Sequence, residues 1–498
     1  MTTRTRPGRL RIGWAASALL IAGCLPAPGT IGLRQPSFAE LVDSATSVPP
    51  LHRTHWGIEV YDPDRGETLY ALNAERHFIP ASNAKLVVTV VAMDELGPEW
   101  RYRTKLYAPR AGPADTVAQA LVVVGRGDPT LSARFHPTAF APFDSLADSV
   151  ALAGVRRVAG ELVVDVSYFD RTAVHPSWEV GDLPYAYAAP VSAFAVAEAS
   201  LEVVVSPGAQ VGQPARVELL GPQVLAVQNQ VTTAVPDTTR AYEAVFVGMD
   251  TLVLAGRIPL GRRPDTVRLA LPDPAVYAGR ALRAALEARG IEVEGEVRIV
   301  QDSIEARLLR AGAPAPIATW TSPPLSEIVA AILQPSQNWI AEQLLKTLGA
   351  ERAGEGSWAA GLTVERRYLT EVVGIDSSAF VLRDASGLSA QNLLTPHAAV
   401  QLLDHARRAP WGDRYRVALA QPGIEGTLKT RFTGLEGRIF AKTGTITHVN
   451  TLSGYVHTSD GRELIFSVMT NASGRPAAEV RRTIDRLVTV LAEQGVRE

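Results

Sequence analysis

Cysteine and lysine are scarce in this chain, and long apolar runs are missing from it. One cysteine, Cys24, occurs among 498 residues, so no disulfide can form within the chain. After the N-terminal 24 residues, no segment of 18 or more apolar residues predicts a transmembrane helix. A formal net charge of −2 argues against general attraction to nucleic acid or to anionic membranes. The nine histidines form no HExxH-like pair, and we expect neither a metal nor another cofactor.

The scarcity of lysine makes each lysine informative. Only five of the 49 basic residues are lysines, and the remainder are arginines. Together with frequent alanine, valine and glycine, this indicates a coding bias in which a surface cation is arginine by default. A buried lysine can lose its proton near neutral pH, which arginine cannot do. We therefore treat all five as candidates for acid–base chemistry: Lys85, Lys105, Lys346, Lys429 and Lys442.

The N-terminus carries the features of an export signal. Four arginines between positions 4 and 11 precede an apolar run from about Ile12 to Ala22, which is too short for a stable membrane anchor. The run ends in LIAGC, which resembles a bacterial lipoprotein signal with Cys24 as the lipid acceptor. The alternative is a plain secretory signal with a chance cysteine. We expect residues 1–24 to be a lipoprotein-type signal peptide. The mature protein would lie in the periplasm or on the outer face of a bacterial membrane.

The remaining chain predicts one domain interrupted by a long insert. Residues 25–50 are weakly patterned and predict a tether. Trp56–Asp62 and Thr68–Asn73 predict a β-hairpin. From 109 to 316, short valine- and leucine-rich runs alternate with Gly, Pro and Asp, which predicts a β-rich insert with one helix at Tyr277–Glu292.

After the insert, the pattern becomes helical and then returns to strands. Leu325–Leu348 has a helical period interrupted at Pro335. The runs RIFAKTGTI, NTLSGYV and ELIFSVMTN predict three consecutive strands, and Ala477–Gln494 predicts a terminal helix. The overall prediction is an α+β fold in which residues 51–108 and 317–498 form one domain around the insert at 109–316.

Three short motifs contain hydroxyl, amide and ammonium groups at junctions between elements. In IPASNAKLVVTV, Ser82 and Lys85 share a face if Ser82 lies in the first turn of a helix. Serine becomes a nucleophile when a neighbouring base takes its proton, and lysine is such a base when burial lowers its pKa. Ser336 and Asn338 follow Pro335 at a loop–helix junction. Lys442 to Thr445 read KTGT at the end of a predicted strand, where Gly444 lets a substrate backbone approach closely.

Each motif alone is a weak signal, and its plain structural interpretation is a helix cap or a strand end. The ordered set Ser-x-x-Lys, Ser-x-Asn and Lys-Thr-Gly-Thr resembles penicillin-binding proteins and serine β-lactamases. The segments GRGDPTLS, GELVVDVSYFD, DASGLSAQNLLTP and GTLKTRF narrow the resemblance to low-molecular-mass class C penicillin-binding proteins, the D-alanyl-D-alanine carboxypeptidase/endopeptidases of peptidase family S13. One departure is Gln337, where that family often has Asp.

The resemblance implies a transpeptidase-like domain, an antiparallel sheet flanked by helices, that acts on D-Ala-D-Ala stem peptides of peptidoglycan. It implies that Ser82 is the nucleophile and Lys85 its base, and that Ser336 and Lys442 pass a proton to the leaving D-alanine while repulsion from Lys442 keeps Lys85 neutral.

Asn338 would bind the peptide amide. The backbone N–H groups of Ser82 and Thr445 would hold the oxyanion, while Thr443, Thr445 and Lys442 would receive the terminal carboxylate. β-Lactams would acylate the same serine. An acidic group of the insert is expected to meet the amino group of the diamino acid, and Asp182 is the candidate.

Two other functions share these motifs. A β-lactamase or esterase on the same scaffold is disfavoured by the long insert and by the lack of an obvious deacylating glutamate. An inactive, lipid-anchored cell-wall-binding protein is disfavoured because both motif lysines would then be free to drift to arginine. A GxSxG hydrolase is excluded because the motif is missing from the sequence.

Overall fold

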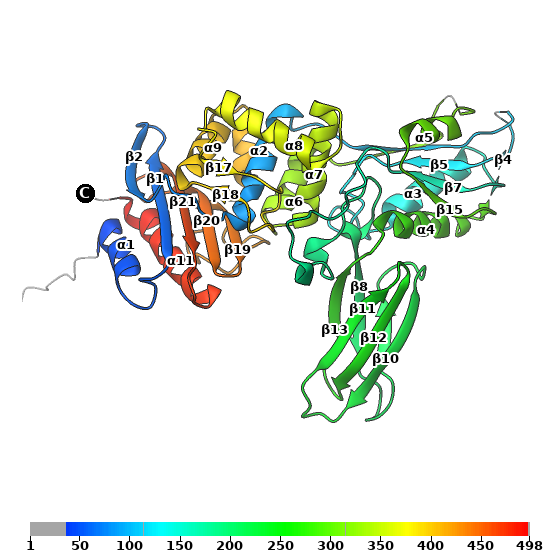
Figure 1. Ribbon diagram of the computed structural model, residues 1–498, viewed down its shortest axis with the longest axis horizontal. Coiled ribbons are helices and arrows are strands. Elements are labelled where there is room, and N and C mark those ends of the chain that lie inside the picture. Colours follow the sequence, from blue (N-terminus) through cyan, green and yellow to red (C-terminus); the bar gives the residue numbers. More distant parts are fainter. Residues whose placement is uncertain (1–35, 113, 314, 497–498) are drawn as a thin grey trace, which may run out of the picture. The chain divides into compact units, whose positions relative to one another are not determined.

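The computed structural model describes residues 36–112, 114–313 and 315–496 (Figure 1). The predicted signal peptide, Cys24 and most of the N-terminal half of the predicted tether lie outside these residues. Within them, no helix is both long and apolar enough to cross a bilayer.

A five-stranded antiparallel sheet forms the centre of the domain that carries the three motifs. Its strand order is β19 (Ile439–Ile446), β20 (Val449–His457), β21 (Glu463–Asn471), β1 (His55–Asp62) and β2 (Glu67–Leu72). The predicted hairpin and the three predicted strands are all present, and β1 pairs with β21, so residues before and after the insert form one sheet. Strand β19, which contains the KTGT motif, is at one edge.

Helices cover both faces of this sheet (Figure 1). On one face, the terminal helix α11 (Ala477–Gln494) buries Val480, Ile484 and Leu487 against apolar side chains of the strands. The opposite face packs against the larger apolar core, to which several helices contribute. These are α2 (Lys85–Glu95), α6 (Leu325–Leu333), α7 (Asn338–Ala353), α8 (Trp358–Arg367), which continues into a π-helical turn at Tyr368–Val373, α9 (Pro396–Arg408) and α10 (Gly412–Ala418). The short strands β17 (Phe380–Val381) and β18 (Leu393–Leu394) pair nearby.

The tether predicted for residues 25–50 is corrected in its second half, where helix α1 (Phe38–Ser47) is found. Ser37 and Glu40 form a capping box that satisfies the first amide groups of this helix. Phe38, Leu41 and Val42 are buried in the same apolar cluster as α11. The apolar residues of this helix span a short segment between Pro- and Ser-containing stretches, so their pattern alone did not predict a helix. Packing against its partner is what gives the helix a buried face.

The insert contains an α/β part, and its boundaries are wider than expected. Its main sheet has the order β15 (Val297–Val300), β7 (Leu162–Asp165), β5 (Leu121–Val124), β3 (Arg103–Tyr107) and β16 (Ala318–Thr321). Strands β3 and β16 lie outside 109–316 but pair with each other. The insert sheet therefore includes the two segments in which the chain leaves and re-enters the first domain. Helices α3 (Ala141–Leu152), α4 (Pro274–Glu287) and α5 (Ser303–Leu309) accompany it, of which only α4 was predicted. A small sheet joins β14 (Glu292–Val293), β6 (Arg157–Val158) and β4 (Val117–Ala118).

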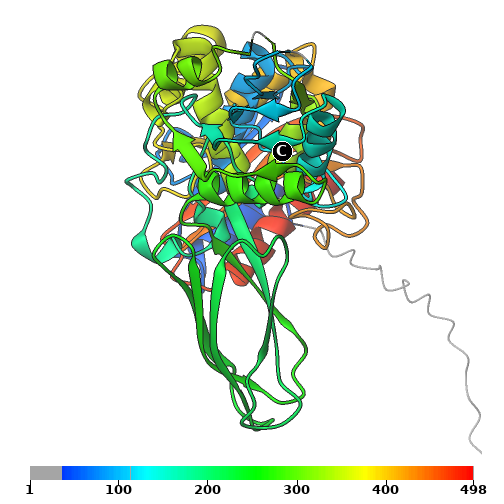
Figure 2. The ribbon, with the colours of Figure 1, turned by 90° about the vertical axis from the view of Figure 1, so that its right-hand side faces the viewer.

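The middle of the insert is all β, as predicted. Strands β13 (Asp265–Ala270), β8 (Ser200–Ser206) and β9 (Arg216–Leu219) form one sheet. A second sheet joins β10 (Ala226–Ala234), β12 (Thr251–Pro259) and β11 (Ala241–Val247), and its long strands run side by side in Figure 2. Three short 3₁₀ turns, η2 (Val180–Asp182), η3 (Ala186–Ala188) and η4 (Ala197–Ala199), connect the α/β part to β8.

Candidate active site

The Ser-x-x-Lys motif lies in a tight turn that runs directly into a buried helix. Residues Ala81–Ala84 form the 3₁₀ turn η1, and α2 begins at Lys85, so Ser82 precedes the helix and does not cap it. In a 3₁₀ turn the side chains at i and i+3 eclipse. Ser82 and Lys85 therefore meet, with Lys85 Nζ 2.9 Å from Ser82 Oγ. The β-branched run that follows Lys85 is a buried helix, as the family resemblance predicted.

The Lys85 ammonium group has three acceptors, which is the number that a lysine can serve. Besides Ser82 Oγ, Nζ donates to Asn338 Oδ1 at 2.7 Å and to the carbonyl oxygen of Ser386 at 2.5 Å. Lys85 is fully buried. Burial lowers the pKa of Lys85 to about 7, although the carboxyl groups of Glu342 and Asp384 act in the opposite direction. A large fraction of Lys85 is therefore neutral at physiological pH, as a general base must be.

The other two motifs meet beside this pair. Lys442, on β19, donates from Nζ to Ser336 Oγ at 2.7 Å and to the carbonyl oxygen of Thr443 at 2.7 Å. Burial, followed by the charge of Lys85, holds the pKa of Lys442 well below its usual value. We expected repulsion from Lys442 to keep Lys85 neutral. In the structure, burial is the largest cause of the lowered pKa at both lysines, and repulsion between the two charges acts in the same direction.

Asn338 and Gly444 both make close contacts within the chain itself. Asn338 Oδ1 accepts from Lys85, and its Nδ2 donates to the carbonyl oxygen of Tyr187 at 2.9 Å, so the amide joins Lys85 to an insert loop. Gly444 was expected to admit a substrate backbone. A Cβ atom there would lie 2.2 Å from Thr451 Oγ1 and 3.0 Å from the backbone nitrogen of Ser82. The glycine therefore allows β19 to contact the serine turn of the chain itself.

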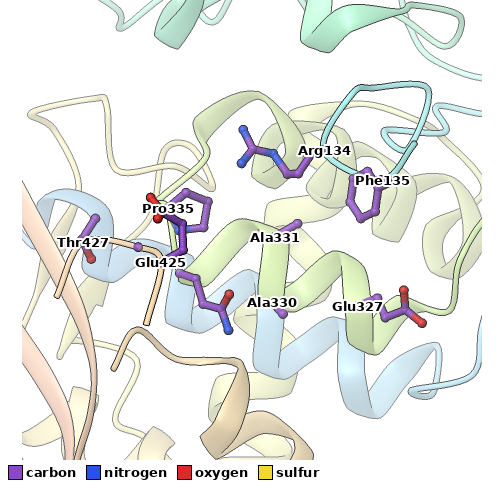
Figure 3. Close-up of a pocket in the computed structure, with 10 residues that line it drawn as sticks. Arg134, Phe135, Glu327, Ala330, Ala331, Pro335, Glu425 and Thr427 are labelled. Atoms are coloured by element: carbon purple, nitrogen blue, oxygen red, sulfur yellow. The ribbon is translucent and has the colours of Figure 1, made fainter. Parts of the chain in front are cut away.

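The remaining KTGT residues lie along the edge strand. Thr443 Oγ1 donates to Thr427 Oγ1 at 2.9 Å, which joins β19 to the GTLKTRF segment. Thr445 is exposed to solvent. A pocket of about 570 Å³ adjoins this edge, and Figure 3 shows Thr427 and Pro335 at one end of it, Ala330 and Ala331 on α6, and Arg134 with Phe135 from the insert. Sequence analysis did not assign Thr427 a role at the site.

Ser336 and Asn338 line a second pocket, of about 490 Å³. Tyr185, Tyr187 and Arg268 of the insert line it. Asp182 lies in η2 and accepts a hydrogen bond from Tyr187 Oη at 2.8 Å. It does not contact the motif residues directly. It is connected to them through Tyr187, whose carbonyl oxygen binds Asn338.

The sequence analysis gave Glu342 and the DASG segment no role at the site, although both position Lys85. Glu342 is fully buried on α7, one turn after Asn338, and accepts from the backbone nitrogen of Ser386 at 2.7 Å and from Trp358 Nε1 at 2.7 Å. It thereby holds the loop whose Ser386 carbonyl oxygen binds Lys85. The available signal was the spacing, because Glu342 is four residues after Asn338 and residues four apart share a helix face.

Asp384 closes the same loop from the other side. It accepts hydrogen bonds from the backbone nitrogens of Gly387 at 2.9 Å and Ser389 at 2.7 Å, and from Trp178 Nε1 of the insert at 2.9 Å. The loop is therefore held by two buried carboxyl groups. The charge of Asp384 and, above all, burial raise the pKa of Glu342 to about 7.

Comparison with known proteins places this geometry in a family. Residues 38–494 match the model of the D-Ala-D-Ala carboxypeptidase 3 (S13) family. The chain is 36% identical over 464 residues to a D-alanyl-D-alanine carboxypeptidase of Actinomadura sp. (strain R39), covering 90% of this chain and 83% of that protein. A crystal structure of penicillin-binding protein 4 (DacB) from Haemophilus influenzae shares the fold, with a TM-score of 0.76 at 20% identity, covering 91% of this chain and 98% of that one. The match of family, fold and three converging motifs means that the chain belongs to the D-Ala-D-Ala carboxypeptidase 3 (S13) family.

Proposed function

We propose that this serine-type D-Ala-D-Ala carboxypeptidase cleaves peptidoglycan stem peptides through an acyl-enzyme on Ser82. The observation that carries the assignment of the nucleophile is the 2.9 Å contact between Ser82 Oγ and the buried Nζ of Lys85, whose pKa is about 7. Ser82 is partly exposed, so a substrate carbonyl can reach its oxygen, while its base stays out of water.

Acylation then follows from the positions of the groups. Neutral Lys85 takes the Ser82 proton as Oγ attacks the carbonyl carbon of the penultimate D-alanine. The oxyanion lies between the backbone N–H groups of Ser82 and Thr445, which lie on the two elements that Gly444 brings together. Asn338 and the Ser386 carbonyl oxygen hold Nζ in place during the transfer.

Departure of D-alanine requires a proton on its nitrogen. Ser336 supplies it, and Lys442, which donates to Ser336 Oγ, replaces the proton on that hydroxyl. The proton that Lys85 took from Ser82 then passes to Lys442, so both lysines return to their starting protonation states. Because Lys442 is fully buried and its Nζ is held by Ser336 and Thr443, we assign the terminal carboxylate to the hydroxyls of Thr443 and Thr445 rather than to Lys442 itself. Water then attacks the acyl-enzyme and releases the shortened peptide.

The edge position of β19 suits an extended peptide substrate. An unpaired strand edge offers backbone N–H and C=O groups to a chain that adds alongside it. The same arrangement accommodates a cross-linked peptide, so we include endopeptidase action on cross-bridges. Digestion of purified cross-linked muropeptides, read by mass spectrometry, separates the two activities: loss of D-alanine alone would restrict the enzyme to carboxypeptidase action.

We assign the amino group of the stem-peptide diamino acid to Asp182. The Tyr187 hydroxyl holds this carboxylate beside the pocket that adjoins Asn338. Asp182→Asn is expected to raise KM about tenfold for a peptide with a free side-chain amine and to leave an N-acetylated peptide unaffected, since only the first contains an ammonium group. Equal effects on both peptides would remove Asp182 from substrate recognition.

The assignment of Ser82 is tested by intact-mass analysis after incubation with benzylpenicillin. We expect one stable adduct on the native protein and none on Ser82→Ala. A crystal structure of the Haemophilus influenzae protein holds a β-lactam, which supports the choice of reagent. Rapid turnover of the drug would instead favour a β-lactamase, and an unmodified native protein would favour the inactive cell-wall-binding alternative.

We also retain export and lipidation at Cys24 as proposals. The intact mass of the protein extracted from bacterial membranes tests them. Removal of residues 1–23 together with the mass of a diacylglyceryl group is expected, and a Cys24→Ser variant found in the soluble fraction is the control. An unmodified Cys24 in the membrane-extracted protein would contradict the lipid anchor.

A further inference from the structure

A strained turn of the insert lies directly behind the Ser336–Asn338 motif. Ala197, Glu198 and Ala199 form η4 with φ angles of 55°, 56° and 52°, three successive left-handed residues without a glycine. L-residues adopt this region at an energetic cost, and such strain persists where the surroundings determine it. The turn projects one polar side chain toward the motif, that of Glu198.

The Glu198 carboxylate is fully engaged. It accepts from Arg134 Nε at 2.8 Å and Nη2 at 3.2 Å, and from Ser132 Oγ at 2.9 Å. Oε2, the oxygen that accepts from Arg134 Nη2, also accepts from Gln337 Nε2 at 2.5 Å. Burial alone would raise the pKa of Glu198, but Arg134 and the hydrogen bonds from Gln337 and Ser132 outweigh it and lower that pKa. The group is therefore an ionised acceptor.

Gln337 transmits this contact to the residues on either side of it. Its side-chain oxygen accepts from the backbone nitrogen of Ile340 at 3.2 Å and caps α7, while its Nε2 binds Glu198. Ser336 itself has a φ of 65°, which lies in the left-handed region that residues other than glycine rarely adopt. Contacts with other residues must therefore hold the segment in this conformation. The neighbours of Gln337 are Ser336, which binds Lys442, and Asn338, which binds Lys85.

We propose that Glu198 is a positioning residue of the insert that sets the geometry of Ser336 and Asn338 through its hydrogen bond to Gln337. This inference rests on the roles proposed above for Ser336 and Asn338. It also predicts that an acidic residue would not be tolerated in place of Gln337. A carboxylate at 337 would face the carboxylate of Glu198, and like charges at hydrogen-bond distance cannot both ionise without a large penalty.

A polarity swap tests the proposal, because glutamine and glutamate have the same shape. We would measure acylation rates with a fluorescent penicillin for Glu198→Gln, Gln337→Glu, the double variant, and the control Glu294→Gln, which breaks an exposed Arg157–Glu294 pair far along the insert sheet. Gln337→Glu is expected to acylate about 10- to 100-fold more slowly at pH 8. The double variant, which restores one amide and one carboxylate, should return to within about threefold of the native rate.

The pH profile separates positioning from a general loss of structure. Arg134 contacts the Glu198 side of the pair, and Arg268 and Tyr187 line the adjoining pocket. As pH falls, one of the two carboxyl groups in Gln337→Glu takes up a proton, so its rate relative to the native protein should rise. Melting temperatures are measured alongside. If Gln337→Glu does not fold, Glu198→Gln decides: slower acylation at an unchanged melting temperature supports the proposal.

Two outcomes overturn the inference. Gln337→Glu acylating at the native rate would show that Glu198 does not position the motif. A double variant as slow as the product of the two single effects would show that the two side chains act independently. A native protein that forms no adduct at Ser82 would instead refute the proposed function, and the two failures are therefore distinguishable.

Discussion

Replacement of Lys85 by arginine is expected to slow acylation of Ser82 about 10⁴-fold, a loss on the scale of removing one member of a catalytic triad. Arginine keeps a positive charge near the hydroxyl but cannot accept its proton at any accessible pH. Lysine can, because burial lowers the pKa of Lys85 to about 7. The native acylation rate should rise with pH through about 7 and level off above it, since the unprotonated amine is the active form.

The matched control is Lys105→Arg, a partly exposed lysine on β3 of the insert. It should leave the rate and its pH dependence unchanged. Stopped-flow acylation by a fluorescent penicillin between pH 5 and 10 gives both quantities. A Lys85→Arg protein that retained more than about a tenth of the native rate would assign the general base elsewhere, with Lys442 the next candidate.

Gly387→Ala should nearly abolish activity without touching any reacting group. A Cβ atom at Gly387 would lie 1.8 Å from the carbonyl oxygen of Ala81 and 3.0 Å from the backbone nitrogen of Ser82. The backbone of the serine turn must therefore shift, and misplacement of a nucleophile by about 1 Å costs on the order of 10²-fold in rate. The measurement is kcat/KM on a D-Ala-D-Ala peptide.

Gly374→Ala separates this steric effect from backbone strain. Gly387 and Gly374 have φ angles of 76° and 84°, but a Cβ atom at Gly374 would meet nothing within 4 Å. Both variants carry the cost of a left-handed alanine, roughly 1 kcal/mol, and should lose similar stability from this cause. Only Gly387→Ala should lose activity. Equal kcat/KM values for the two variants would contradict the proposed contact with the serine turn.

The five lysines show how much the amino-acid composition alone could predict. Three of the five lysines, Lys85, Lys346 and Lys442, are fully buried. Lys346 binds Asp170 at 2.5 Å and lies over the ring of Trp358, so it joins α7 to the insert and has no contact with Ser82. Scarcity therefore indicated burial at these positions. It could not separate a catalytic lysine from a structural one, because lysines of both kinds occupy buried positions that suit an ammonium group.

By itself, the sequence indicated the family, paired Ser82 with Lys85, and predicted the KTGT motif at the end of a strand and most elements of the central domain. The elements and the Ser82–Lys85 pair follow from local spacing and short-range periodicity in contiguous residues, and the family follows from the resemblance of its ordered motifs. Tertiary structure alone decided that Glu342 holds the Ser386 carbonyl oxygen on Lys85, that Gly444 and Gly387 press against the serine turn, and that Glu198 reaches Gln337. Each of these contacts joins residues far apart in the chain. Their energies depend on burial and on distances of a few ångströms, and no local pattern encodes either quantity.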